Sequence, residues 1–220
     1  MVFIMSLENV KLGIFDHSGV LSDDRRPVYE ANMFLLEKYG VSRISMGAWL
    51  AATKASAGEL VQSFGIDIPE KDIDEEYAAV YTDIVSRKDN PIRPEMYSDV
   101  PDVLWRLRND RGIKLAIVSN HPKSNLVREL TEYGVLDLFD EVSGDPMPKA
   151  ERLKMVCDKF EVLPRESFFV EDTIYGLRSG YEAGVNSIGV TTGYHSREML
   201  EGERTAVVVV DSLTELLGLL

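Results

Sequence analysis

The sequence contains a single cysteine, Cys157, among 220 residues. A chain with one cysteine cannot form an internal disulfide, which favours a reducing compartment. Cys157 lies in an apolar stretch with Met155, Val156 and Phe160, and no histidine is near it in the sequence. A thiol in such surroundings is typical of helix packing, so we do not expect a reactive cysteine.

Basic residues and long apolar runs are also scarce. The 24 lysines and arginines are outnumbered by 37 aspartates and glutamates, which gives a formal net charge of -13 at pH 7. The field of such a protein repels polyanions, which argues against nucleic acids and anionic membranes as partners. No apolar run approaches the roughly 20 residues of a membrane-spanning helix. The short apolar start at 1–5 lacks the basic flank of a signal peptide, so we expect a cytoplasmic protein.

Five short, largely apolar segments recur along the chain, separated by stretches with helical periodicity. They cover residues 10–15, 114–118, 167–170, 187–190 and 206–210. Strands that read as continuous apolar runs between helices are typical of a parallel sheet that is buried on both faces. The pattern therefore predicts an α/β protein whose core is a three-layer, Rossmann-like parallel sheet.

The segment between the first two predicted strands does not alternate in this way. Apolar residues repeat at helical spacing over 28–39 and again over 77–84, and Pro91 and Pro94 mark a linker back to the sheet. We therefore predict a helical cap domain at 22–93. It is inserted into a core domain that consists of 1–21 and 94–220.

Polar side chains follow three of the predicted strands. They are Asp16, Ser119 with Asn120, and Glu171 with Asp172. The carboxyl ends of parallel strands meet at one edge of the sheet, where ligands bind, so these side chains should gather there. Carboxylates from two strand ends would crowd negative charge together, and a bound cation is then expected.

Four motifs in order along the chain resemble those of the haloacid dehalogenase superfamily, in the branch with a helical cap after the first motif. They are Phe15-Asp-His-Ser-Gly-Val-Leu21, Ile117-Val-Ser-Asn120, Lys149 in a Pro-Met-Pro-Lys segment, and Val170-Glu-Asp-Thr-Ile-Tyr-Gly176 followed by Ala183-Gly184. Within the superfamily, the chain looks most like phosphoglycolate phosphatases and β-phosphoglucomutases. The resemblance covers essentially the whole sequence.

The resemblance implies a phosphatase that works through an aspartyl-phosphate on Asp16. A carboxylate nucleophile divides one difficult displacement into two easier ones. Mg²⁺ would screen the repulsion between the reacting anions, and hard oxygen ligands would hold it. The family pattern places those ligands on the carboxylates of Asp16, Glu171 and Asp172 and on the main-chain carbonyl of Ser18.

The same resemblance assigns residues that hold the phosphoryl group. They are Ser119, Asn120, Lys149 and Gly19, with Ser119 and Lys149 also acting in catalysis. The implied substrate is a small phosphorylated metabolite that is admitted beneath the cap. Residues 46–53 are the candidate specificity segment, although Trp49 within it is expected to pack in the core. The sequence leaves open whether the protein is a monomer or a homodimer.

One position departs from the family pattern. Family phosphatases carry a second aspartate two residues after the nucleophile, as a general acid and base, and Ser18 occupies that catalytic position here. Proton transfer of this kind contributes roughly 100-fold to 10,000-fold. His17 and His121 are possible replacements. The alternative is a phosphate- or metal-binding protein with little or no turnover.

Three related activities of the superfamily can be compared with the replacement of this aspartate by Ser18. Phosphonatases also lack the second aspartate, but Leu50 stands where they need a cap lysine. Dehalogenases work without a metal, whereas both carboxylates of the fourth motif are present here. Phosphomutases depend on the missing aspartate. A phosphatase remains the preferred interpretation, with a phosphonatase-type hydrolase as an alternative.

Overall fold

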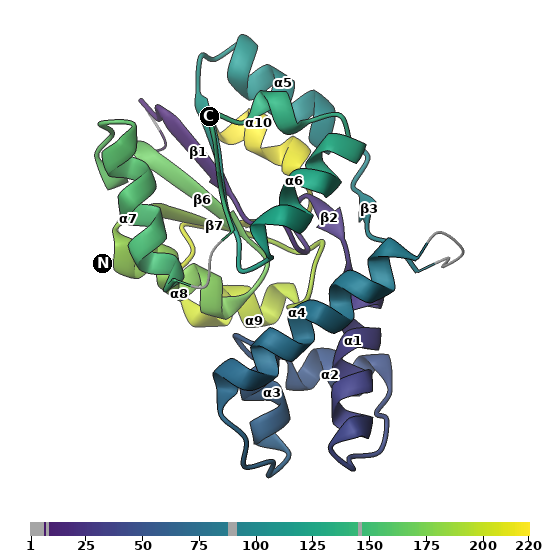
Figure 1. The fold of residues 1–220 in the computed structure, drawn as a ribbon. Coiled ribbons are helices and arrows are strands. Elements are labelled where there is room, and N and C mark those ends of the chain that lie inside the picture. Colours follow the sequence, from purple (N-terminus) through teal and green to yellow (C-terminus); the bar gives the residue numbers. More distant parts are fainter. Residues whose placement is uncertain (1–6, 8, 88–91, 145–146) are drawn as a thin grey trace. The chain divides into compact units, whose positions relative to one another are not determined.

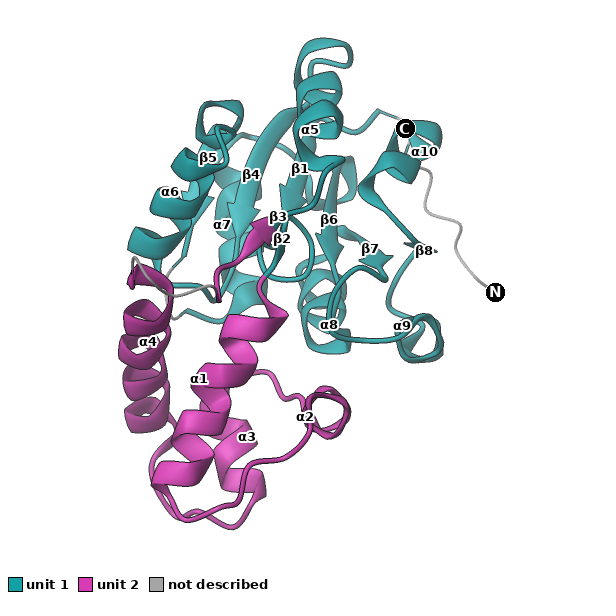
Figure 2. Cartoon of the chain, turned by 90° about the vertical axis from the view of Figure 1, so that its right-hand side faces the viewer, with its two compact units in different colours: residues 1–23, 96–220 teal, residues 24–95 magenta. Residues whose placement is uncertain are grey.

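The structure is a computed structural model that describes residues 7, 9–87, 92–144 and 147–220. Pro91 of the predicted linker lies outside these residues. The chain divides into two compact units, shown in different colours in Figure 2. Unit 1 comprises Met1–Asp23 and Met96–Leu220, and unit 2 comprises Asp24–Glu95.

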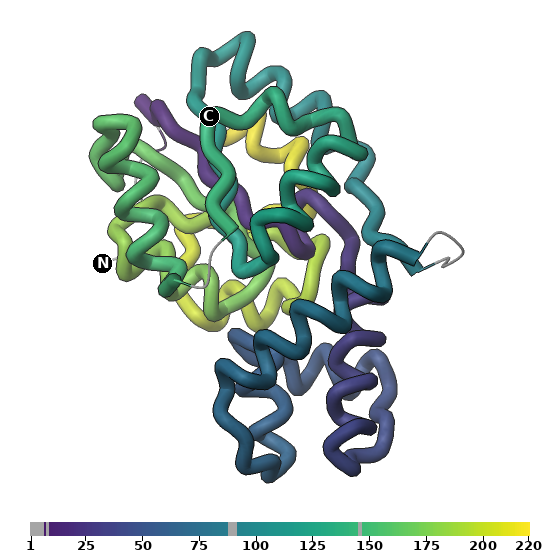
Figure 3. Tube along the Cα trace, viewed as in Figure 1, coloured from purple at the N-terminus to yellow at the C-terminus, as the bar shows by residue number. Residues whose placement is uncertain are grey.

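Unit 1 is built on a six-stranded sheet in which every neighbouring pair of strands is parallel. Its order is β5-β4-β1-β6-β7-β8, and Figure 2 labels all six strands. Figure 1 colours the ribbon along the sequence, and Figure 3 shows the Cα trace in the same view. The strands are β1 (Leu12–Phe15), β4 (Lys114–Val118), β5 (Glu141–Ser143), β6 (Ser167–Glu171), β7 (Asn186–Val190) and β8 (Val208–Val210). The predicted parallel α/β core is therefore confirmed. β1 lies between β4 and β6, so the strand order reverses there and creates a switch point of the kind that binds ligands.

Helices connect these strands and cover both faces of the sheet. They are α5 (Val100–Asn109), α6 (Lys123–Glu132), α7 (Lys149–Lys159), α8 (Ile174–Ala183), α9 (Arg197–Glu203) and α10 (Leu216–Leu219), with 3-10 turns η1 (Leu136–Leu138), η2 (Pro164–Glu166) and η3 (Leu213–Glu215). Within the described ranges, no helix combines the length and the apolar composition that crossing a bilayer requires.

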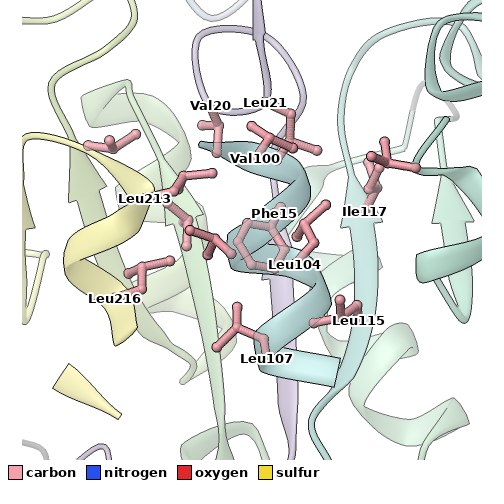
Figure 4. Close-up of a cluster of buried hydrophobic side chains, with 14 of the residues drawn as sticks. Phe15, Val20, Leu21, Val100, Leu104, Leu107, Leu115, Ile117, Leu213 and Leu216 are labelled. Carbon is pink, nitrogen blue, oxygen red and sulfur yellow. The ribbon is translucent and has the colours of Figure 1, made fainter. Parts of the chain in front are cut away.

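Alternation along the strands divides the core into two layers. Phe15 and Ile117 face α5, α6 and α10, and their cluster includes Leu104 and Leu216 (Figure 4). The intervening side chains, such as Ile14, pack on the opposite face against α7 and α8. This second cluster also contains the buried Cys157, as expected for a thiol used in helix packing. Burial on both faces explains why the strands read as continuous apolar runs.

Unit 2 is helical. Its helices are α1 (Arg25–Lys38), α2 (Met46–Ala52), α3 (Ala57–Ser63) and α4 (Glu70–Ser86). The apolar stripes of α1 and α4 meet at Ala31, Tyr81 and Val85, with Tyr77 and Ile84 partly buried beside them. Trp49 of α2 is 1% exposed and packs edge-on against Tyr29, so it is a core residue, as expected.

Two short strands, β2 (Ser22–Asp23) and β3 (Glu95–Met96), form a separate two-stranded sheet. They lie where the chain passes from unit 1 into unit 2 and back again. The two changes of unit therefore fall at 23–24 and 95–96, in or beside paired strands.

Candidate active site

Asp16 follows directly after β1 at the centre of the sheet. Its N–H donates to Val170 O at 3.0 Å, which continues the pairing of β1 with β6 past Phe15. The residue is 6% exposed, and its Oδ1 has no hydrogen-bond partner in the described part of the chain. A buried carboxylate oxygen is costly without a partner, so this atom is suited to meet a cation or a reacting group.

Lys149, the first residue of α7, is paired with two carboxylates. Its Nζ lies 2.8 Å from Glu171 Oε2 and 3.2 Å from Asp16 Oδ2, and its side chain is 11% exposed. Burial alone would lower the pKa of Lys149, but the negative charges of Asp16 and Glu171 outweigh burial and raise that pKa. The amine is therefore a fixed positive charge beside Asp16.

Glu171, the last residue of β6, is fully buried and organises the loop that follows. Its Oε1 accepts hydrogen bonds from Asp172 N at 3.1 Å, Thr173 N at 3.0 Å and Thr173 Oγ1 at 2.9 Å, while Oε2 accepts from Lys149. A side chain at Gly176 would place its Cβ 1.9 Å from Glu171 Oε2, which explains the glycine in this motif. Glu171 therefore fixes the positions of Lys149 and of the residues at the start of α8.

Asp172 completes a cluster of three carboxylates. Its Oδ2 accepts from Tyr194 N at 2.7 Å, whereas Oδ1 has no partner among the described residues. Burial, and then the negative charges of Glu171 and Asp16, raise the pKa of Asp172 well above its usual range. Asp16, Glu171 and Asp172 offer carboxylate oxygens that lie within 4.8 Å of one another. Three carboxylates against one lysine, with two oxygens unpartnered, fit a hard divalent cation such as Mg²⁺.

A tight turn at 17–22 brings the main chain against this cluster. Gly19 adopts a left-handed conformation with φ of +72°, and a Cβ at this position would lie 2.1 Å from Asp172 Oδ2. The Gly19 carbonyl accepts from Thr192 Oγ1 at 2.6 Å. The turn therefore lies directly against Asp172, and only glycine fits both the conformation and the space.

Ser119 and Asn120 follow β4, the strand that neighbours β1. Ser119 is 2% exposed, and its Oγ accepts from His121 N at 3.3 Å. Arg152, one turn along α7 from Lys149, donates to Ser119 O at 2.5 Å and also to Asn120 Oδ1. Asn120 is itself exposed, so its side chain is held at the surface of the loop by a guanidinium that is buried.

A second buried polar cluster lies beside these loops. His17, His121 and Glu129 place their ring nitrogens and carboxylate oxygens within 4.8 Å of one another. Nε2 of His17 lies 2.8 Å from Glu129 Oε2, and Nε2 of His121 lies 3.3 Å from Glu129 Oε1. Each imidazole thus faces Glu129 with its Nε2, and the two histidines form a cluster of their own with this residue of α6.

The sequence-predicted residues fall into two sets. Asp16, Lys149, Glu171 and Asp172 form one connected, buried cluster. The other predicted residues, Ser18, Gly19, Ser119 and Asn120, belong to the two loops that follow β1 and β4. All eight belong to unit 1.

Sequence reasoning missed three elements of the site. They are Arg152, Glu129 and the loop at 192–194, which supports Gly19 and Asp172. Spacing could have identified Arg152, because it lies one helical turn after Lys149. Glu129 and the loop carry no local pattern, and only the folded chain brings them to the site.

Comparisons with known proteins show the family to which the chain is similar. A family model described as haloacid dehalogenase-like hydrolase matches residues 13–190. The chain is 30% identical over 130 residues to a phosphoglycolate phosphatase of Haemophilus influenzae, in an alignment that covers 57% of each chain. It is 26% identical over 199 residues to a phosphoglycolate phosphatase of Psychrobacter arcticus, covering 84% of this chain and 85% of the relative. The match to the first relative thus spans little more than half of its length.

The solved structures share the fold. A haloacid dehalogenase-like family hydrolase from Streptococcus pneumoniae superposes with a TM-score of 0.81 at 15% identity. The superposition covers 96% of this chain and 98% of the other.

Proposed function

The chain belongs to the haloacid dehalogenase-like hydrolase family, and on that premise we propose that it is a Mg²⁺-dependent phosphatase of small phosphate monoesters. The observation that carries the proposal is the pairing of Asp16 with Lys149, beside two carboxylate oxygens that have no partner among the described residues. A nucleophile, a fixed cation and a set of hard oxygen ligands are the parts that phosphoryl transfer requires.

The first step is attack by Asp16 on phosphorus. A carboxylate oxygen of Asp16 forms a bond to phosphorus, the bond from phosphorus to the ester oxygen breaks with its electron pair on that oxygen, and the leaving group takes its proton from water. Water then attacks the same phosphorus, the acyl–phosphate bond breaks, and inorganic phosphate and free Asp16 are produced. The ion pair with Lys149 holds the Asp16 carboxylate in position, and the same amine neutralises charge that develops on the phosphoryl oxygens.

The donor set suits Mg²⁺, which when bound would screen the negative charges of the nucleophile and the phosphoryl group. Asp16 and Asp172 would supply their unpartnered Oδ1 atoms as ligands. Glu171 already accepts four hydrogen bonds, so it holds Lys149 and would act on the metal through its charge or through Oε2. The Ser18 carbonyl belongs to the adjacent turn and is the remaining proposed ligand.

Ser119, Asn120 and Gly19 complete the proposed phosphate site. The Ser119 hydroxyl would donate to a phosphoryl oxygen, as would main-chain N–H groups of these loops. Loss of one such donor typically costs on the order of 100-fold to 1000-fold in rate. The buried guanidinium of Arg152 holds the Ser119 carbonyl and thereby the loop.

Ser18 limits the kinds of ester that this site can hydrolyse rapidly. A serine cannot protonate the departing oxygen near neutral pH, and the Nε2 atoms of both nearby imidazoles face Glu129. Leaving groups that depart without a proton should therefore react best. The expected substrates are activated phosphate esters rather than simple alkyl phosphates.

We propose that unit 2 acts as a cap that selects the substrate, with 46–53 as the specificity segment. Gly47 and Ala48 on α2 are exposed and next to the buried Trp49. Ala48→Arg should change the ratio of kcat/KM between two phosphate esters with different alcohols. An unchanged ratio would contradict a role for this segment.

The test of the proposed function is hydrolysis of para-nitrophenyl phosphate and of phosphoglycolate, with Mg²⁺ and with a chelator. The relatives' names make phosphoglycolate the alkyl ester to compare, and it should react more slowly than para-nitrophenyl phosphate, whose leaving group departs without a proton. Asp16→Asn should abolish hydrolysis, whereas Asp137→Asn, a surface control, should not. Hydrolysis that persists in Asp16→Asn, or that does not depend on Mg²⁺, would contradict the proposal.

A second candidate function, binding without turnover, is favoured by Ser18 alone. Such a protein would bind Mg²⁺ and phosphate but hydrolyse nothing. It would also remain inert after Ser18→Asp. Hydrolysis by the parent or by this variant rejects it.

A further inference from the structure

We infer that Glu129 is a positioning residue, which ties the loop that carries the nucleophile to the loop that carries Ser119. The inference deepens the proposed function and rests on it. Glu129 lies on α6 and is 1% exposed. Its two carboxylate oxygens face different loops: Oε2 meets His17 of the loop after β1, and Oε1 meets His121 of the loop after β4.

The Glu129 carboxylate is ionised under ordinary conditions. Burial alone would raise its pKa, but hydrogen bonds from His121 and His17 lower that pKa from 4.5 to about 2. An ionised carboxylate accepts hydrogen bonds and cannot donate them. The facing Nε2 atoms of both imidazoles therefore carry protons, and the bridge has defined donors and a defined acceptor.

His17 connects this bridge to the whole turn beside the metal site. Its main-chain carbonyl accepts from the N–H groups of Val20, Leu21 and Ser22, at 3.3, 2.9 and 3.0 Å. The turn that contains Ser18 and Gly19 is therefore closed by hydrogen bonds to the carbonyl of His17, and Glu129 binds the side chain of that same residue. A shift of His17 would move Asp16 on one side and Ser18 on the other.

Tyr133 strengthens the same attachment one helical turn after Glu129. Its ring stacks on His17 with centroids 6.2 Å apart, and its hydroxyl lies 2.8 Å from Ser22 Oγ. The end of α6 thus contacts the first and last residues of the turn. Side chains four residues apart share one face of a helix, which is why a single helix can hold both ends.

On the other side, His121 connects the bridge to the proposed phosphate site. Its main-chain N–H donates to Ser119 Oγ at 3.3 Å, so the imidazole held by Glu129 belongs to a residue that orients the serine hydroxyl. Displacement of the reacting groups by about 1 Å can cost on the order of 100-fold in rate. The bridge therefore acts on catalysis without touching the substrate.

The same three side chains have the composition of a metal site, but their contacts favour a hydrogen-bonded bridge. Both oxygens of Glu129 already accept from imidazoles, and the Arg128 guanidinium lies 3.3 Å from Oε1. The adjacent guanidinium would repel a second cation. Mutual hydrogen bonding satisfies the groups that face one another.

The test compares Glu129→Gln with Glu132→Gln, an exposed site on the same helix. Glutamine keeps the shape but has only one oxygen acceptor, so it cannot serve both imidazoles. Glu129→Gln should lower kcat by roughly 10-fold to 100-fold, with a smaller change in KM. Glu132→Gln should leave both parameters unchanged. Equal kcat values for the two variants would overturn the inference.

A double-mutant cycle with Ser119→Ala separates positioning from a loss of folded protein. If Glu129 positions Ser119, Ser119→Ala should cost less in the Glu129→Gln background than in the parent. If Glu129→Gln only unfolds part of the sample, the fold-change caused by Ser119→Ala will be the same in both backgrounds. That second result would reject a positioning role.

A spectroscopic measurement tests the Glu129 bridge even if the parent shows no hydrolysis and the proposed function fails. Long-range ¹H–¹⁵N correlation spectra of the imidazoles should show protons on Nε2 of His17 and His121, and Glu129→Gln should shift both resonances. Spectra with the proton on Nδ1 alone, or unchanged by Glu129→Gln, would show that the bridge does not form.

Discussion

Gly19 and Asp172 are so close that a methyl group on Gly19 would lie 2.1 Å from Asp172 Oδ2. The two residues are far apart in the sequence and come from the loops after β1 and β6. The contact places the turn that carries Ser18 against the carboxylate that we propose as a metal ligand. Steric and catalytic requirements therefore coincide at Gly19.

Gly19→Ala should damage both the fold and metal binding. Gly134 is a matched control, because its φ is +70° but a Cβ there would meet nothing within 4 Å. Gly134→Ala should lower the free energy of unfolding by about 1–2 kcal/mol, because alanine is strained in the left-handed conformation. Gly19→Ala should cost more and should also weaken Mg²⁺ binding, as measured by denaturation and calorimetry. Equal losses of stability and unchanged Mg²⁺ affinity would contradict the assigned contact.

Asp172→Asn should change thermal stability differently with and without Mg²⁺. Without the ion, the substitution removes one of three crowded carboxylates, so the melting temperature should stay constant or rise. Mg²⁺ should stabilise the parent, because a ligand that binds only the folded state raises its stability, but it should not stabilise the variant. Differential scanning fluorimetry with and without Mg²⁺ measures both effects. A variant that Mg²⁺ stabilises as much as the parent would show that the ion binds elsewhere.

Ser18→Asp should raise the rate and change its dependence on the leaving group. The new carboxyl would supply general acid and base catalysis, worth roughly 100-fold to 10,000-fold when fully effective. Alkyl phosphates, whose leaving groups need a proton, should gain more than para-nitrophenyl phosphate. The measurement is kcat/KM for both kinds of ester in parent and variant, with Ser18→Asn as the uncharged control. An equal gain for both would argue against Ser18 as the reason for slow proton transfer.

The stabilising contribution of Glu129 should depend on pH. Its folded pKa of about 2 lies below the ordinary 4.5, so the contribution is complete above about pH 5 and disappears as pH falls towards 2. The difference corresponds to about 3 kcal/mol at neutral pH. The groups around it are His17, His121 and Arg128, and the guanidinium stays charged throughout this range.

The measurement is urea unfolding of the parent, Glu129→Gln and Glu132→Gln between pH 7 and pH 3. The stability gap between the parent and Glu129→Gln should shrink by about 2 kcal/mol at pH 3. The gap for Glu132→Gln should stay near zero. A gap for Glu129→Gln that does not change with pH would mean that the carboxylate is not held by its neighbours in ionised form.

The sheet was largely predictable because buried parallel strands have a continuous apolar signal. The predicted strand at 114–118 matches β4, and the one at 187–190 differs from β7 by a single residue. β5 was missed because it has three half-buried residues, Glu141–Ser143, and no apolar run. The first and last predicted strands began two residues too early, at positions that precede the first sheet pairings of β1 and β8.

The meeting of the candidate site residues was predictable where a motif lies within one loop. Asp16, Glu171 and Asp172 each follow or end a strand, so their meeting at one edge follows from parallel topology. Glu129 lies in the middle of α6, where a glutamate ordinarily faces solvent, and nothing local indicates that two imidazoles surround it. Its role depends on its contact with His17, which lies more than one hundred residues away in the sequence.

The most direct test of the account is mass spectrometry of the Asp16 peptide after the parent has been mixed with Mg²⁺ and para-nitrophenyl phosphate and quenched in acid. Because Ser18 cannot activate water, the acyl phosphate should accumulate, and a phosphoryl group should be found on Asp16. The modification should be absent from Asp16→Asn and from samples without Mg²⁺. Turnover with no phosphoryl group on Asp16, or with hydrolysis preserved in Asp16→Asn, would contradict Asp16 as the nucleophile.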